Sequence, residues 1–163
     1  MATTAITAQD RNGHALPTIL RAGLLAGLLD GLDAALFIGL ARGIPPIRVF
    51  QFIASGLLGV SSFRGGWATA ALGIALHFLI AISAAAVFYA LSLKWTILLR
   101  KPLLWGPVYG MGVFLFMHDL VVPLSAAPVQ PPAAASALLN LIFSHIFFVG
   151  IPIAWVTSQA RSR

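Results

Sequence analysis

Four long runs of apolar residues decide what this chain can fold into. They cover about residues 18–41, 67–92, 103–122 and 136–157, and charged side chains within them are few. A helix that crosses the hydrocarbon core of a bilayer needs about 20 mostly apolar residues. The runs therefore predict an all-α integral membrane protein, folded as one bundle of four transmembrane helices.

The composition agrees with a membrane location. The chain of 163 residues is 60% hydrophobic and 9% charged, whereas a soluble domain carries about 25% charged residues. The ten Lys and Arg residues are scattered at the ends of the runs, so the net charge of +6 reflects membrane topology and not nucleic-acid binding. The absence of cysteine excludes disulfides, thiolate metal sites and covalent c-type haem attachment.

The basic residues also predict an orientation. The connection 91–103 holds three of them, while the proline-rich connection 123–135 holds no charge. The positive-inside rule places 91–103 and the basic C-terminal tail, 158–163, in the cytoplasm. With an even number of spans the polar N-terminal tail, 1–17, is cytoplasmic too. The predicted span ends carry tryptophans, which prefer the headgroup level: Trp67, Trp95, Trp105 and Trp155.

A fifth apolar segment is short. Between Arg48 and Arg64 lie 15 residues, fewer than a comfortable span requires. Four spans with the N-terminus inside place seven basic residues inside and three outside, and five spans with the N-terminus outside give the same division. Length favours four, so we expect a short re-entrant or interfacial helix at about 47–63, on the outer side.

The first run has two different faces when it is turned by about 100° per residue. One face is leucine-rich and suits lipid: Leu25, Leu28, Leu29, Leu32 and Leu36. The other holds small and acidic residues: Gly23, Ala26, Gly27, Asp30, Asp33 and Ala34. Small residues allow close helix packing, so we expect Gly23, Gly27 and Gly31, and likewise Gly106 and Gly110, at helix–helix contacts.

The two aspartates therefore point into the bundle. A charge at bilayer depth costs about 2.5–3.5 kcal/mol on insertion scales, so each must be neutral, paired or beside water. At about 1.5 Å per residue from the outer span end, Asp33 is about 12 Å deep, and His77 and His145 are about 13–15 Å deep. We predict an intramembrane polar layer of these residues: Asp30, Asp33, His77, His118, Asp119, Asn140 and His145.

Three interpretations of this layer stay open. Polar side chains join membrane helices through hydrogen bonds worth about 0.6 kcal/mol each, which is the structural one. Intramembrane ionisable residues are also candidates for a proton or ion pathway. Finally, imidazole suits Zn, Cu and Fe, so His77, His118 and His145 are candidate ligands of haem b or a metal ion. Against this, consecutive residues such as His118 and Asp119 diverge by about 100° on a helix.

No catalytic motif accompanies these residues. The chain has no phosphate-binding GxxxxGK[ST] loop, no GxSxG elbow and no glutamate. We therefore expect a non-enzymatic protein: an interaction or accessory subunit, or a minor transport-type protein, in contact with lipid and with a partner membrane protein or further copies of itself. A haem- or metal-binding redox subunit is the alternative.

The order of features over residues 73–154 resembles that of the YagU-like small inner-membrane proteins of bacteria. The stretches are "GIALHFLIAISAAAVFYAL", "LLWGPVYGMGVFLFMHDLVVPLSAAPVQPP" and "SHIFFVGIPIAW". The resemblance implies a protein of the bacterial inner membrane in which three histidines are of interest, and it names no substrate. It is carried by these positions: His77, Tyr89, Trp105, Gly106, Gly110, His118, Pro123, Leu124, Pro131, Pro132 and His145.

Overall fold

The computed structural model describes residues 8–128 and 135–161. Every regular element in these residues is a helix, so the predicted all-α class is confirmed. Five helical segments are long and apolar enough to cross a membrane, one more than the four predicted spans: Ala15–Ala41, Pro46–Arg64, Gly66–Lys94, Pro102–Leu124 and Ala135–Arg161. Residues 8–17 of the predicted N-terminal tail are helical as well, and residues 1–7, 129–134 and 162–163 of the predicted tails and outer loop lie outside the described residues.

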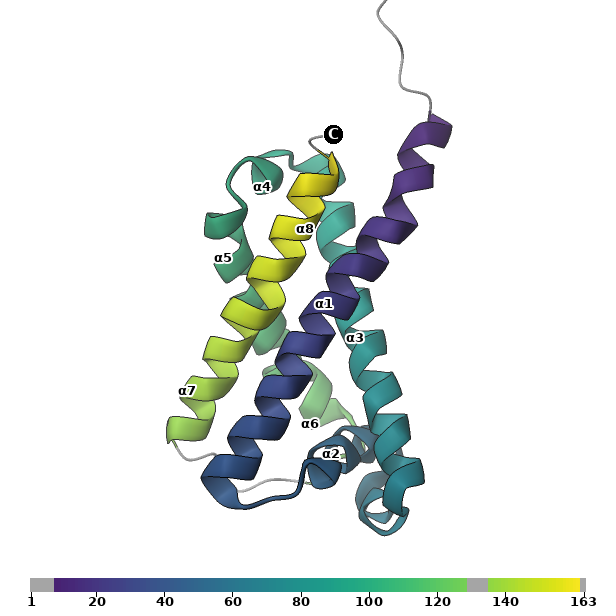
Figure 1. Cartoon of the computed structure of the whole chain (residues 1–163), viewed down its shortest axis with the longest axis vertical. Coiled ribbons are helices and arrows are strands. Elements are labelled where there is room, and N and C mark those ends of the chain that lie inside the picture. Colours follow the sequence, from purple (N-terminus) through teal and green to yellow (C-terminus); the bar gives the residue numbers. More distant parts are fainter. Residues whose placement is uncertain (1–7, 129–134, 162–163) are drawn as a thin grey trace, which may run out of the picture.

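The long helices form rods that run along the molecule (Figure 1). The first is α1 (Ala8–Arg42) and the second is α3 (Gly66–Lys94). The third is α5 (Pro102–Phe116), continued by the π-helical η2 (Met117–Val121) and by α6 (Val122–Leu124). The fourth is α7 (Ala135–Ser144), the π-helical η3 (His145–Gly150) and α8 (Ile151–Arg161).

The remaining helices lie at the two ends of these rods (Figure 1). Helix α2 (Pro46–Leu58) and the 3₁₀ segment η1 (Gly59–Arg64) lie at the end where α1 finishes and α3 begins. The short α4 (Ile97–Arg100) lies at the other end, between α3 and α5, where α8 also finishes.

Glycines set the closest helix contacts. A Cβ at Gly23 would lie 2.5 Å from Cα of Ile82, so α1 and α3 meet almost backbone to backbone. In the same way Gly110 of α5 contacts the His145 carbonyl of η3, and Gly73 of α3 contacts the Phe50 carbonyl of α2. No larger side chain fits at these positions unless the helices separate, which is the packing typical of membrane bundles.

Large apolar side chains cover the outside of the bundle. Leu28, Leu36 and Leu40 of α1 are 51%, 60% and 87% exposed. The fully buried residues are mostly small, with Phe88 and Ile153 as the largest apolar ones. A soluble bundle would place its leucines inside and polar residues outside, so this inverted distribution indicates a surface that faces lipid.

Both π-helical segments end two residues before a proline. A proline ring clashes with the carbonyl four residues earlier and supplies no N–H to it. For Pro123 that carbonyl belongs to Asp119 in η2, and for Pro152 it belongs to Phe148 in η3. The wider π turn accommodates the ring, so each rod continues past its proline instead of ending there.

Candidate functional site

The two aspartates of α1 lie against α7. The Ser144 hydroxyl donates a hydrogen bond to Oδ1 of Asp30 at 2.6 Å, and the Asn140 amide donates to Oδ2 of Asp33 at 2.9 Å. The acids are three residues apart and their donors are four apart, in opposite order along the chain. This is the pattern expected where two antiparallel helices face each other, since residues three and four apart share a helix face.

His77 adds the third helix to this set. Its Nε2 lies 2.8 Å from the Gly27 carbonyl, and because a carbonyl only accepts, Nε2 carries the proton. The same nitrogen is 4.0 Å from Oδ2 of Asp30. A Cβ at Gly31 would lie 3.0 Å from Nε2, so this glycine leaves the space that the imidazole occupies.

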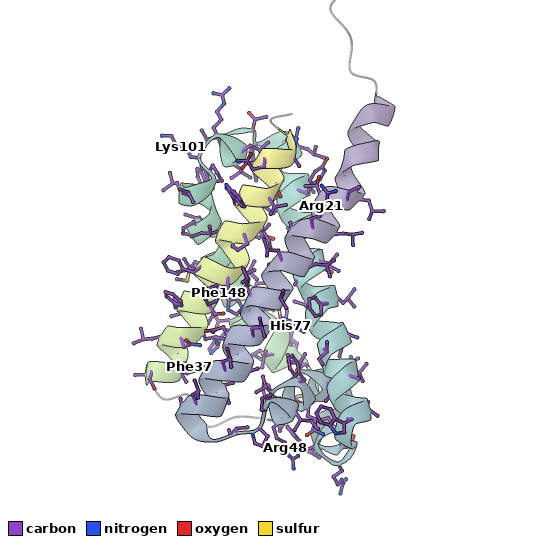
Figure 2. The ribbon with its side chains drawn as sticks, viewed as in Figure 1. Arg21, Phe37, Arg48, His77, Lys101 and Phe148 are labelled. Atoms are coloured by element: carbon purple, nitrogen blue, oxygen red, sulfur yellow. The ribbon has the colours of Figure 1, made fainter. Side chains whose placement is uncertain are left out.

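We call this set the aspartate cluster: Asp30, Asp33, His77, Asn140 and Ser144. The side chains of Asp30 and His77 are 17% and 13% exposed. Figure 2 places His77 between the end that carries Arg21 and Lys101 and the end that carries Arg48. The cluster thus lies within the length of the rods, among apolar helices.

The other predicted members of the polar layer lie elsewhere. His118 and Asp119 of η2 bind each other, with Nδ1 and Oδ1 2.7 Å apart, and their side chains are 50% and 62% exposed. Consecutive residues diverge on a helix, and the exposed side chains of these two reach each other across that angle. His145 donates through Nδ1 to the Leu141 carbonyl at 2.9 Å.

An aromatic ring separates the two remaining histidines. The ring centroid of Phe114 is 5.3 Å from that of His118 and 5.8 Å from that of His145. We call these residues the histidine cluster: Phe114, His118, Asp119 and His145. His77 makes its polar contacts on α1 instead, so the three candidate ligands of a haem or metal are divided between two places. Within residues 8–128 and 135–161, no group of three His, Cys, Asp or Glu side chains is arranged to hold a metal ion.

The predicted packing glycines of α1 and α5 lie at helix contacts. Gly27 lies beside the Phe78 ring of α3, to which a Cβ would come within 2.8 Å. Gly106 lies beside the backbone of Ile151, and a Cβ at Gly106 would lie 2.8 Å from Cα of Ile151. Gly150, which was not predicted, completes the second contact from the opposite side by lying against Gly106 and Gly110.

Two polar groups escaped the sequence analysis. Ser144 was not predicted, because no residue near it in the sequence forms a catalytic motif with it. It follows Asn140 by four residues, so both lie on one helix face. Gln51 is 2% exposed and donates to the Gly66 carbonyl at 2.9 Å, which ties α2 to the start of α3. Gln51 could have been predicted as a buried hydrogen-bonding residue, because it is a single amide inside a short apolar helix.

In comparisons with protein-family models, with curated proteins and with solved structures, no match to this chain was found.

Proposed function

We propose that this is a small, non-enzymatic membrane protein of transport type, in which the aspartate cluster passes protons across part of the bilayer. The observation that carries the proposal is the 4.0 Å approach of His77 Nε2 to Asp30 Oδ2 among apolar helices. Ionisable residues at such a depth are costly and are functional candidates by default.

The hydrogen bonds suggest how a proton would move. With Nε2 protonated and bonded to the Gly27 carbonyl, the Nδ1 lone pair of His77 is the position that accepts an incoming proton. The resulting imidazolium releases its Nε2 proton to Asp30, after the gap closes from 4.0 Å to hydrogen-bond distance, about 2.8 Å. Ser144 holds the other carboxyl oxygen of Asp30 during this step.

A shallow, mostly apolar groove on the bundle surface lies beside the second acid. It is lined by Phe37 of α1 and by several residues of α7 and η3, with Asn140 among them. Since Asn140 also holds Asp33, the Asp33–Asn140 pair borders a surface groove, while Asp30 lies next to His77.

The proposal includes a topology of four crossings. Helix α1 finishes and α3 starts at the same end of the molecule, and α2 with η1 lies between them at that end (Figure 1). This arrangement supports a re-entrant or interfacial α2–η1 segment, with both termini in the cytoplasm of a bacterium and the protein in its inner membrane. The resemblance to YagU-like proteins belongs to the same proposal.

Proton flux into proteoliposomes after a pH step tests the function. We expect flux through the wild-type protein and a loss of tenfold or more in Asp30→Asn and in His77→Gln, because neither replacement exchanges a proton. Leu28→Ala, on the exposed face of the same helix, is the matched control and keeps the flux. If wild-type protein carries no flux, the cluster joins helices only, and the protein is an interaction or accessory subunit.

A further inference from the structure

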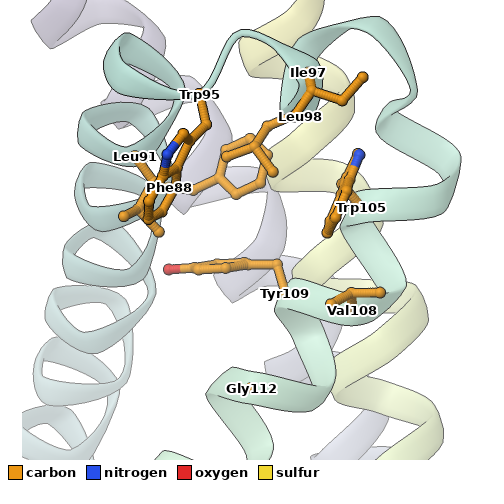
Figure 3. A pocket seen from close by; sticks show the side chains of 9 residues that line it. All are labelled: Phe88, Leu91, Trp95, Ile97, Leu98, Trp105, Val108, Tyr109 and Gly112. Atoms are coloured by element: carbon orange, nitrogen blue, oxygen red, sulfur yellow. The ribbon is translucent and has the colours of Figure 1, made fainter.

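A second feature lies at the opposite end of the bundle from α2. A cavity of about 430 Å³ lies between the last turns of α3, the short α4 and the first turns of α5 (Figure 3). Aromatic side chains form much of its wall, among them Phe88, Trp95, Trp105 and Tyr109. The Tyr109 hydroxyl donates to the Ala84 carbonyl at 2.6 Å, so this polar group is already occupied. The walls are therefore suited to hydrocarbon.

The cavity is accessible from the lipid side. Trp95 and Val108, which line it, are 51% and 55% exposed. Gly112 lies on the same side, and a Cβ there would meet no atom within 4 Å. From Trp105 to Gly112 the cavity follows about 10 Å of helix α5, at about 1.5 Å per residue. This is the shape expected for a slot that takes up part of an acyl chain.

One buried donor in the wall has no acceptor. Trp105 Nε1 is buried and has no hydrogen-bond partner among the described residues. In Figure 3 this nitrogen lies at the end of the ring nearest the connection between α3 and α5. A buried donor is costly if it stays unpaired, and indole rings prefer the headgroup level of a bilayer. Because the nitrogen itself is closed off from the cavity, Trp105 contributes to the wall through its ring and not through a hydrogen bond to a bound molecule.

Cations surround the same end. Lys94, Arg100 and Lys101 are exposed, and Lys94 Nζ lies 5.5 Å from the ring centroid of Trp95, in the cavity wall. The sequence has no acid between Asp33 and Asp119, so the helices α2 to α5 bring no carboxylate to this end. Basic residues between the ends of membrane helices attract anionic headgroups.

We propose that this cavity binds an anionic phospholipid. One acyl chain fills the slot along α5, and the headgroup phosphate lies among Lys94, Arg100 and Lys101. The site is independent of the aspartate cluster, which lies in the rods beyond it.

Fluorescence of Trp105 tests the proposal. The variant W67F/W95F/W155F leaves Trp105 as the single tryptophan. It is reconstituted in phosphatidylcholine vesicles that contain a minor fraction of brominated-chain phosphatidylglycerol or, in the same proportion, brominated-chain phosphatidylcholine. We expect phosphatidylglycerol to quench Trp105 preferentially. At about 1 kcal/mol per basic residue, each cation contributes about fivefold to this preference.

Three further variants of the single-tryptophan protein separate the parts of the site. Gly112→Phe fills the open space and abolishes quenching by either lipid, while Leu115→Phe, on the exposed face of the same helix, leaves it unchanged. K94Q/R100Q/K101Q keeps the quenching and removes the preference, and it remains informative if Gly112→Phe does not fold. Equal quenching by both lipids in the starting variant would overturn the proposal. Absence of quenching would also overturn it, since a protein surface, such as a second copy, would then cover the cavity.

Discussion

At the scale of single residues, the aspartates are held by neutral donors and not by cations. Asp33 accepts from an amide and Asp30 from a hydroxyl, while the imidazole of His77 stays 4.0 Å away from Asp30. Neutral hydrogen bonds between membrane helices average about 0.6 kcal/mol and reach about 1.7 kcal/mol. Each carboxyl thus adds modestly to stability, and its chemistry is not fixed in an ion pair.

We expect Asp33→Asn to fold with a loss of less than about 1 kcal/mol in the free energy of unfolding, because its amide oxygen still accepts from Asn140. Asp33→Leu removes the acceptor and leaves the Asn140 amide unpaired, so it should be the less stable of the two. Reversible unfolding in detergent measures both. Equal stability of the two variants would mean that the Asp33–Asn140 contact contributes nothing.

At the scale of helices, stability depends on how closely the backbones approach. Helix α1 reaches α3 through Gly23 and Gly27, and α5 reaches η3 through Gly106 and Gly110. The leucines on the outer face of α1 make no comparable contact within the bundle.

We expect Gly27→Leu to lower the thermal stability of the bundle strongly, because even a Cβ would lie 2.8 Å from the Phe78 ring. Leu28→Ala, the neighbouring position and 51% exposed, should change it little, since it exchanges lipid contact for lipid contact. Thermal unfolding of both variants in the same detergent is the measurement. An unchanged midpoint for Gly27→Leu would contradict the observed α1–α3 contact.

The helices were predictable because their signals are local. Long apolar runs fixed most helix ends to within about four residues, although α1 begins ten residues before the predicted 18. The 3.6-residue period of α1 distinguished its leucine face from the face of Gly23 and Asp30. The side-chain partners of the polar residues were harder to predict, because the depth of a residue along a helix does not say which way the side chain points around the helix axis. His118 and His145 have depths that suit a shared layer, yet they lie around Phe114 and apart from His77. The π turns before Pro123 and Pro152 change that rotation further, and the apolar runs alone do not reveal them.

At the scale of the whole molecule, the two ends of the bundle differ in charge. Lys94, Arg100, Lys101 and Arg161 belong to the end where α8 finishes, and Arg48 and Arg64 to the end with α2. Under the positive-inside rule the first end is cytoplasmic, which agrees with the proposed four crossings.

Single cysteines give a direct test of the topology, since the chain has none of its own. With four crossings, Pro45→Cys and Arg64→Cys flank α2–η1 and react with an impermeant thiol reagent from the same face of the membrane. Lys101→Cys reacts from the opposite face. All three positions are exposed. Labelling of Pro45→Cys and Arg64→Cys from opposite faces would establish five crossings.

The pairing of α1 with α7 also has a consequence for biosynthesis. Asp33 and Asp30 find donors that are 107 and 114 residues further along the chain. At roughly 5–20 residues per second, α1 leaves the ribosome roughly 5–23 s before those donors exist. During that interval the acids oppose insertion, while each leucine favours it by about 0.3–0.6 kcal/mol. The exposed leucines of α1 are therefore what keeps the first helix in the membrane until the last helix has been synthesised.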